Sequence, residues 1–376
     1  MKIYAKIEAL LLNCLKLIWT LFVGLHEKKN IRRKRKLYCS EELSQEQKQQ
    51  IDSYFLENYG KKVPYKWHRL YKSYTGKFDY RYTPEFIYTT KQELLQNKRL
   101  DVRPIENKAL LKNFVRGMED VVRIPETYIA CVQGCYYDGD GNIISRNKAI
   151  ELLKNRNNGT YQAICKKTVD TGSGRDVYLM NIKDGIDVNK KESIDSILKS
   201  MSDNFVVQEK IKPHPSFSAL YSGSVNTLRV ISYQTAGGFK VAPIIMRIGR
   251  NGFVDNAHAG GVFIGVTEEG RLLKEAFTEY QERYTKRPVS GVEFEGHLLS
   301  RVPDIAQVAI QMHKYYPTLK FISWDFTVDA NNNIVLIEVN LYSQSIWLAQ
   351  MAHGCGIFGE DTAEMLQLVS KKKTSQ

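Results

Sequence analysis

The first 25 residues carry apolar side chains at the spacing of an α-helix. Positions three and four apart share one side of a helix, and this spacing links Ile3, Ile7, Leu10, Leu11, Cys14, Ile18, Leu21, Phe22 and Leu25. The opposite stripe holds Lys2, Lys6, Asn13, Lys16 and Thr20. Basic residues dominate positions 28–36. We therefore predict a membrane-associating amphipathic helix with a basic linker over residues 1–40.

Charges within this helix argue against an ordinary membrane span. A spanning helix needs about 20 apolar residues, and Lys6, Glu8 and Lys16 interrupt the run. A cleaved signal peptide would end in a small-x-small site, which we do not find. We expect residues 1–36 to contact anionic lipid on the inner face of the cytoplasmic membrane, with the rest of the protein in the cytoplasm. The alternative is a helix packed on the protein's own core and followed by a solvated basic loop.

Residues 41–104 read as a helical, aromatic-rich lobe. Ser40 followed by two glutamates predicts the start of its first helix. Residues 67–79 then gather polar and aromatic side chains around Gly76, and we predict that His68 and Lys77 bind substrate there. Aromatic side chains with polar tips also cover ordinary helical lobes, so both interpretations stay open.

A lysine strand and a glycine-rich loop mark residues 105–205. Residues 163–167 and 177–182 have the pattern of strands, and the loop between them contains Gly172, Ser173, Gly174 and Arg175. Glycine lets backbone N–H groups approach an anion closely. We predict that this loop and Lys166 contact phosphates, although Gly-Ser-Gly hairpins are common.

The strand predicted over residues 204–211 ends in polar residues. Gln208, Glu209, Lys210 and Ile211 could offer backbone and side-chain groups to an adenine edge. An ordinary buried strand would look almost the same.

The most specific pattern is a hairpin near the C-terminus, within the part spanning residues 206–376. Two alternating strands flank a turn at residues 330–333. The two-residue period puts Glu338 and Asn340 on one face, and the antiparallel return brings Asp325 opposite them. Two carboxylates and an amide oxygen suit Mg²⁺.

Two further segments carry candidate chemistry. Arg229 lies in an otherwise apolar strand, so its guanidinium needs an anionic partner such as a phosphoryl group or a carboxylate. The polar loop at residues 255–261 could bind an acyl intermediate through its N–H groups. Its candidate substrate-binding residues are Asn256, His258, Gly260 and Gly261.

Charge and cysteine content limit the possible partners. The chain has a net charge of +13. Residues 1–40 contain ten Lys and Arg against two Glu, so only about +5 remains for the rest of the chain. That excess is too small to indicate nucleic acid. Six scattered cysteines fit free thiols in a reducing cytoplasm.

The order of these motifs resembles the ATP-grasp superfamily, and more narrowly the sugar-transfer-associated ATP-grasp family of bacterial polysaccharide loci. The resemblance implies an α+β fold in which two antiparallel-sheet lobes clasp ATP, here preceded by a helical N-terminal lobe. The resemblance covers residues 41–370. The segments that match most closely are Trp67–His68, 75–79, 224–229, 255–261 and 324–340.

The resemblance also implies roles for individual residues. Lys108 and Lys166 would bind ATP phosphates under a lid formed by residues 172–175, and residues 208–211 would hold adenine. Asp325, Glu338 and Asn340 would ligate Mg²⁺, while Asn226 and Arg229 would be catalytic. Members of the superfamily often have an acidic residue shortly after the adenine-binding segment, where it binds the ribose hydroxyls. This sequence has no acidic residue at that place. Lys167 replaces the usual proline, so either lysine could face ATP.

The expected reaction is ATP-dependent ligation of a carboxylate to an amine or related nucleophile through an acyl phosphate. Family association suggests a sugar or glycan intermediate of cell-surface polysaccharide, such as a capsule, as one substrate. The alternatives are a kinase that phosphorylates a hydroxyl group, and a non-catalytic nucleotide-binding scaffold for a membrane glycosyltransferase.

Overall fold

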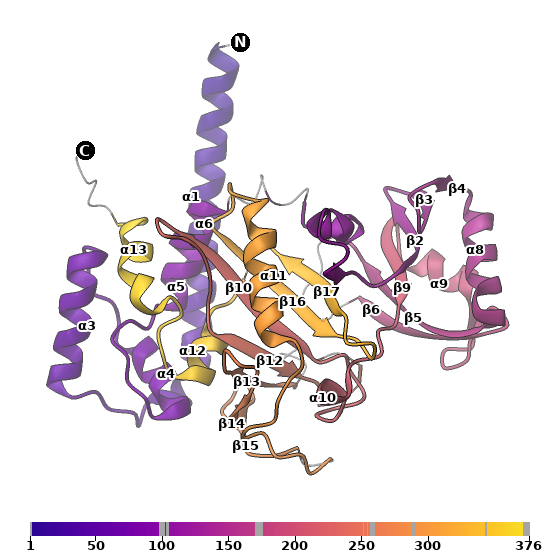
Figure 1. Cartoon of the computed structure of the whole chain (residues 1–376). Helices are drawn as coiled ribbons and strands as arrows, with labels where there is room; N and C mark the ends of the chain where they lie inside the picture. The colour runs from indigo at the N-terminus through magenta and orange to yellow at the C-terminus, as the bar shows by residue number, and fades with distance from the viewer. Residues whose placement is uncertain are drawn as a thin grey trace.

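Two β-sheets and a helical region make up the chain in the computed structural model (Figure 1). The structure describes residues 2–97, 102, 105–169, 176–250, 252–253, 255, 260–287, 290–342 and 344–370. The α+β class predicted from the sequence is confirmed.

The N-terminal helix is longer than predicted. Helix α1 (Lys2–Arg33) continues through most of the basic residues, and α2 (Arg35–Tyr38) follows almost at once. The expected basic linker is therefore wrong, because this segment is helical and docks on the body through the buried side chains of Glu27, Ile31 and Lys34. The N-terminal half of α1 projects from the body (Figure 1).

The helical lobe follows α1. Its first helix, α3, begins at Gln45 rather than after Ser40, because Ser44 and Gln47 form a capping box. The elements of the lobe are α3 (Gln45–Asn58), α4 (Lys66–Thr75), α5 (Glu85–Ile87), η1 (Tyr88–Gln92) and α6 (Glu93–Gln96).

In the described part of the chain the smaller sheet is antiparallel throughout, in the order β4-β3-β2-β9-β5-β6-β7-β8. Helices α8 (Arg146–Asn155) and α9 (Ile194–Ser200) share a core with it. Its strands are β2 (Thr127–Val132), β3 (Cys135–Asp138), β4 (Ile143–Ile144), β5 (Thr160–Lys167), β6 (Val177–Lys183), β7 (Ile186–Asp187), β8 (Glu192–Ser193) and β9 (Asn204–Glu209).

The larger sheet has the order β1-β17-β16-β10-β12-β13-β14-β15 over the described residues, with β11 paired to β10. Only β1 is parallel to its neighbour. Its strands are β1 (Val122–Arg123), β10 (Thr227–Thr235), β11 (Gly238–Val241), β12 (Ile244–Ile248), β13 (Val262–Val266), β14 (Leu272–Phe277), β15 (Arg283–Tyr284), β16 (Phe321–Val328) and β17 (Ile334–Asn340).

The larger sheet is covered on both faces. Alternate residues such as Trp324 and Phe326 pack with α11 (Val302–Lys314). Residues of the opposite parity, including Phe263 and Phe321, pack with the helical lobe and α12 (Trp347–His353). The helical lobe thus occupies the face of the sheet toward which Asp325 also points, because Asp325 shares the parity of Phe321. The remaining helices are η2 (Lys108–Val115), η3 (Arg156–Gly159), α10 (Pro215–Ser218), η5 (Gly359–Asp361) and α13 (Thr362–Gln367).

The lobes differ from the predicted boundaries at residues 104/105 and 205/206. Residues of η2 and β1 pack with the larger sheet, so the smaller lobe begins only at β2. It ends with β9 at Glu209, four residues beyond the predicted boundary. A local pattern identifies strands, but their partners in the sheet decide the lobe to which they belong.

Candidate active site

The C-terminal hairpin brings its polar residues together as predicted. Asp325 on β16 lies opposite Glu338 on β17, and Ser323 lies opposite Asn340. A β-bulge between Asp325 and Phe326 shifts the register at this point. Asp325 is 1% exposed, whereas Glu338 is partly open, so one carboxylate is enclosed and the other can meet a ligand.

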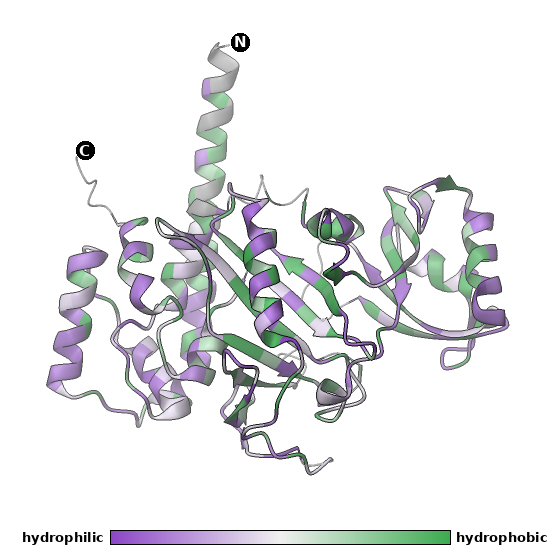
Figure 2. Cartoon of the chain, in the orientation of Figure 1, coloured by the Kyte–Doolittle hydropathy of each residue, from purple (hydrophilic) through white to green (hydrophobic). Residues whose placement is uncertain are grey.

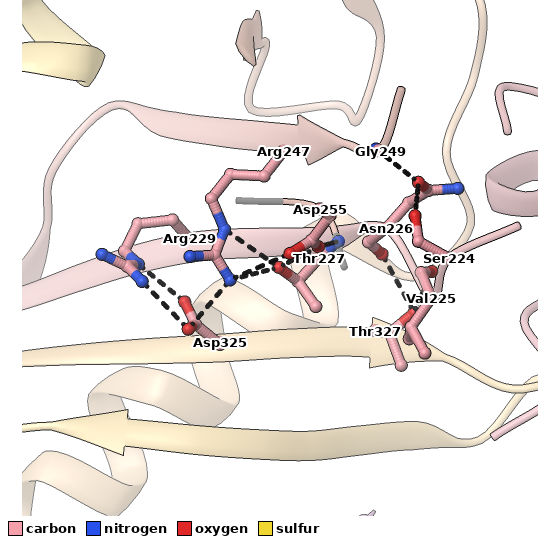
Figure 3. Close-up of polar contacts among 10 residues, drawn as sticks. All are labelled: Ser224, Val225, Asn226, Thr227, Arg229, Arg247, Gly249, Asp255, Asp325 and Thr327. Atoms are coloured by element: carbon pink, nitrogen blue, oxygen red, sulfur yellow. Dashed lines mark hydrogen bonds and ion pairs between the residues drawn. The ribbon is translucent and has the colours of Figure 1, made fainter. Parts of the chain in front are cut away.

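Two arginines enclose the Asp325 carboxylate (Figure 3). Arg229 Nε lies 2.6 Å from Oδ1, and one terminal nitrogen of each of Arg229 and Arg247 lies 3.0 Å from Oδ2. Burial alone would raise the pKa of Asp325, but the two guanidinium groups hold it below its ordinary value. Asp325 is therefore a fixed anion in this protein.

Arg247 is a site residue that the sequence reasoning missed. It lies on β12, donates to Thr227 Oγ1 at 2.6 Å, and lies 3.6 Å from the Asp255 carboxylate. Asp255 in turn accepts 2.7 Å hydrogen bonds from the backbone N–H and the hydroxyl of Thr227. The signal was available, because Arg247 is a single charge in an apolar strand, as Arg229 is.

Two predicted phosphate-binding lysines meet Glu338 from different segments. Lys108 Nζ, at the start of η2, lies 3.0 Å from Glu338 Oε1. Lys166 reaches the same place from β5 and is nearly buried. Burial lowers the pKa of Lys166 to about 8, Lys108 adds to the lowering, and Glu338 opposes it. Lys167 faces elsewhere and pairs with Asp176 at 3.2 Å, so Lys166 is the inward lysine.

The predicted adenine segment crosses from the smaller to the larger lobe. Gln208 donates to Thr127 Oγ1 at 3.1 Å, and Lys210 donates to Gln162 Oε1 at 2.7 Å. Ile211 is buried. These side chains already contact other parts of the protein. The backbone N–H and C=O groups of residues 208–211 are therefore the groups that can bind a ligand.

Glu209 is tied to a second missed residue, Arg123. One Arg123 terminal nitrogen lies 2.8 Å from Glu209, and another lies 2.8 Å from Asp329 in the β16–β17 turn. Arg123 is the last residue of β1, just before the chain enters the smaller sheet. It therefore links the two lobes at the point where the chain passes between them.

Asn226 has a positive φ of 54° and a fully engaged side chain (Figure 3). Its amide oxygen accepts from Ser224 Oγ at 2.7 Å and from the Gly249 N–H at 3.1 Å. Its amide nitrogen donates to the carbonyls of Phe217 and Tyr221 at 3.0 and 2.6 Å. These bonds hold the loop that leads into β10, and Asn226 lies three residues before Arg229.

His68 is wrong as a substrate ligand, because it lies inside the helical lobe. Its side chain is completely buried, packs edge-on against Phe55, and lies 3.2 Å from the Tyr80 carbonyl. Burial lowers its pKa to about 4, so it is neutral. Lys77 is exposed beside Gly354, and no contact in the described structure joins it to the charged cluster.

The predicted lid and acyl loop are only partly described. Gly172, Ser173, Gly174, Arg175, Asn256 and His258 lie outside the described residues. Gly260 has a φ of +87°, which favours glycine, and Gly261 is buried before β13.

The C-terminal hairpin has part of the ligand set that Mg²⁺ requires. Among the described residues no group of three His, Cys, Asp or Glu side chains could hold a metal ion, and the third predicted ligand, Asn340, is an amide. The buried Asn340 atom that lacks a hydrogen-bond partner is the amide nitrogen Nδ2, a donor and not a metal ligand, whereas the Glu338 carboxylate is partly open. Asp325 Oδ1 accepts only one bond in the described structure. The partly open Glu338 carboxylate and the remaining lone pairs of Asp325 are oxygen ligands of the kind that a hard cation prefers.

Comparison with known families identifies most of the chain. A family model described as sugar-transfer associated ATP-grasp matches residues 89–365, more than half of the sequence. The comparison with curated proteins gives no match. ATP and Mg²⁺ are the usual cofactors of the ATP-grasp fold.

Solved ATP-grasp structures are distant. The D-alanine-D-alanine ligase of Coxiella burnetii is 12% identical over 73% of this chain and 59% of its own, with a TM-score of 0.38. The biotin carboxylase domain of Hydrogenobacter thermophilus 2-oxoglutarate carboxylase, solved with MgADP, is 12% identical over 74% of this chain and 48% of its own, with a TM-score of 0.41. The chain thus spans about half the length of these proteins, and at such scores they carry no argument about its activity.

Proposed function

Because the chain belongs to the sugar-transfer associated ATP-grasp family, we propose that it binds ATP with Mg²⁺ and activates a carboxylate for attack by an amine or a related nucleophile. The observation that carries this proposal is the charged cluster between the lobes. Four cations, Lys108, Lys166, Arg229 and Arg247, there surround the carboxylates of Asp325, Glu338 and Asp255. Such a surplus of positive charge suits a polyphosphate.

Each residue has a part in this proposal. Glu338, Asn340 and Asp325 hold Mg²⁺, which neutralises phosphate charge when bound. Lys108 and Lys166 contact the phosphates, residues 172–175 cover them, and the backbone of residues 208–211 faces adenine. Residues 256–261 bind the acyl substrate.

The reaction has two balanced steps. A carboxylate oxygen of the substrate attacks the γ-phosphorus of ATP, and ADP leaves to give an acyl phosphate. The amine nitrogen then forms a bond to the acyl carbon, the bond to phosphate breaks, and the amine loses a proton. Arg229 stabilises the negative charge of the acyl phosphate. Asn226 holds in place the strand that carries Arg229. We assign the carboxylate or the amine to a sugar or glycan intermediate of cell-surface polysaccharide, such as a capsule.

We also place the protein on the inner face of the cytoplasmic membrane through residues 1–36. Within the described residues, α1 is the one helix long and apolar enough to cross a bilayer, a property it shares with many signal sequences. Cell fractionation of the full chain tests this placement, and a wholly soluble protein would remove it.

Thermal shift with ATP, with and without Mg²⁺, tests the nucleotide site. We expect a Mg²⁺-dependent rise in Tm for the wild type, because a ligand that binds only the folded state stabilises it. Glu338→Ala should lose the rise, and exposed Glu295→Ala should keep it. Equal rises in both variants would contradict the assignment of Glu338.

Product analysis tests the reaction. Release of ADP that requires both a carboxylate and an amine supports a ligase. A phosphorylated product that is stable in acid would identify a kinase instead, because an acyl phosphate hydrolyses.

A further inference from the structure

Helix α1 has two sides with different surroundings. At 100° per residue, the exposed side chains of Leu11, Ile18, Phe22 and Leu25 fall within one arc of about 140°. The same arc contains the exposed Lys28, Lys29, Arg32 and Arg33. We call this arc the outward side. It is apolar toward the N-terminus and basic toward the body, and no described residue covers it.

The opposite side of α1 faces the body. Glu27 and Ile31 are buried there, and a Cβ added at Gly24 would be in ordinary van der Waals contact with the Thr90 methyl group at 3.9 Å. The polar Lys6 and Asn13 fall in the same arc of about 100° further toward the N-terminus. The body-facing side therefore carries polar residues where α1 leaves the body, whereas the outward side carries the apolar Leu11 and Ile18 over the same stretch. Apolar and polar residues both occur along the projecting part of α1 (Figure 2).

Trp19 and Lys34 anchor this segment near both ends of the larger sheet. Trp19 hydrogen-bonds the Tyr342 hydroxyl, two residues after Asn340. Lys34 pairs with Glu279 at 2.5 Å, directly after β14, and its ammonium lies 4.4 Å from the Trp347 ring. The orientation of α1 is thus fixed relative to the hairpin that carries Glu338.

We propose that α1 lies in the plane of an anionic bilayer, with its outward side in the lipid and the body, including the hairpin, on the aqueous side. This deepens the membrane location given above and rests on it, but it does not depend on the reaction. The charge favours this partner, since Lys28, Lys29, Arg32 and Arg33 extend the apolar arc with cations that suit phosphate headgroups.

The contacts oppose a spanning arrangement. The body already reaches α1 at Trp19, and Ile7 to Ile18 measures only about 18 Å. The hydrocarbon core of a bilayer is about 30 Å thick. A span would bury Lys6 and Asn13 and draw the body into lipid, whereas the in-plane arrangement keeps both residues in water.

Flotation of the full chain with vesicles tests binding. We expect binding to phosphatidylcholine vesicles containing phosphatidylglycerol and weak binding to phosphatidylcholine alone. Leu11→Glu should weaken binding about tenfold or more, because it places a charge in the apolar arc. Asn13→Glu is the matched control, since it adds the same charge on the other side, and it should bind nearly as the wild type does. Equal losses in the two variants would overturn the proposal.

An environment-sensitive fluorophore distinguishes the orientations. The exposed Cys14, Cys39 and Cys135 are first replaced by serine, and a label is placed at Leu11→Cys, Ile18→Cys, Leu25→Cys or Asn13→Cys. In-plane docking predicts a blue shift on vesicle addition at the first three positions and none at residue 13.

Shifts at residues 11, 13 and 18 together would show a span, and no shift anywhere would show no lipid contact. Blue-shifted labels without vesicles, together with a dimer by light scattering, would show that a second copy covers this side. Each of these three results overturns the proposal.

Discussion

Lys166 is a buried lysine at the place proposed for the ATP phosphates. Its pKa is lowered to about 8 by burial, so a growing fraction of the free protein has a neutral Lys166 as the pH rises past that value. A bound polyphosphate favours the charged form, and binding must then take up a proton.

We predict that ATP–Mg²⁺ affinity falls between pH 7 and pH 9 and that proton uptake accompanies binding near pH 8. Calorimetry in buffers of different ionisation enthalpy measures this uptake. Lys166→Gln should bind more weakly and lose the uptake, whereas Lys167→Gln should retain it, because Lys167 pairs with Asp176 instead. Uptake that persists in Lys166→Gln would assign the proton to another group.

Glu85 is a second buried titratable residue, and its burial makes the stability of the protein depend on pH. It is completely buried, accepts a 3.3 Å hydrogen bond from the Ile346 N–H, and has one oxygen without a partner. Burial raises its pKa well above 4.5, and the neighbouring Glu27 raises it further. The folded state therefore binds a proton that the unfolded chain releases near pH 4.5. The stability from this proton is complete below pH 4.5 and is lost as the pH rises through the raised value.

We predict that Glu85→Gln makes Tm less dependent on pH between pH 5 and pH 8, since the amide copies the protonated acid without its titration. Thermal unfolding across this range measures the slope. Exposed Glu57→Gln is the control and should leave the slope unchanged. An unchanged slope in Glu85→Gln would show that Glu85 does not carry the proton.

At the scale of the elements, Arg123 connects strand β9 to the β16–β17 turn. Its guanidinium pairs with Glu209 in one lobe and with Asp329 in the other. Asp329 is 5% exposed in its side chain, so loss of its partner leaves a largely enclosed charge.

We predict that Arg123→Gln lowers stability by about 1–3 kcal/mol and weakens ATP binding by altering how the lobes meet. Chemical denaturation and nucleotide titration measure the two effects. Arg146→Gln is a suitable control because Arg146 pairs with Asp195 within the smaller lobe. It should affect stability without changing ATP affinity, so equal effects on affinity would argue against a special role for the interlobe link.

For the whole molecule, the arrangement of cores predicts which parts unfold together. Helix α4 of the helical lobe and one face of the larger sheet share a core, with Tyr74 packed on Phe263 and Phe277, whereas α3 belongs to a separate cluster. The smaller lobe has a separate core of its own. Separate cores can open independently, whereas a shared core resists opening of either part.

We predict that hydrogen exchange protects α4 about as strongly as the larger sheet, and that the smaller lobe exchanges faster. ATP with Mg²⁺ should slow exchange in β5 and β9, since both lobes contact the nucleotide in the proposed complex. Exchange measured by mass spectrometry tests both statements. Early exchange of α4 would show that the helical lobe opens by itself.

The sequence by itself determined the features that depend on local periodicity. Alternation along residues 323–340 predicted that Asp325 faces Glu338 across the hairpin, and in the structure this pairing also depends on a β-bulge between Asp325 and Phe326 that shifts the register by one residue. The helical spacing of Leu11, Ile18 and Leu25 likewise predicted a helix, and all three residues lie in α1. The family resemblance added the order of the parts and is confirmed over residues 89–365.

Only the tertiary structure decided which distant groups share a site. Arg247, Asp255 and Asp325 come from three separate segments, and their contacts depend on strand order rather than on any local pattern. The prediction for His68 was wrong for the same reason. Its polar and aromatic neighbours in the sequence suggested a substrate site, but in the structure His68 is buried in the helical lobe. Burial depends on how the elements pack. A side chain on a given side of a helix is exposed or buried according to whether another element covers that side.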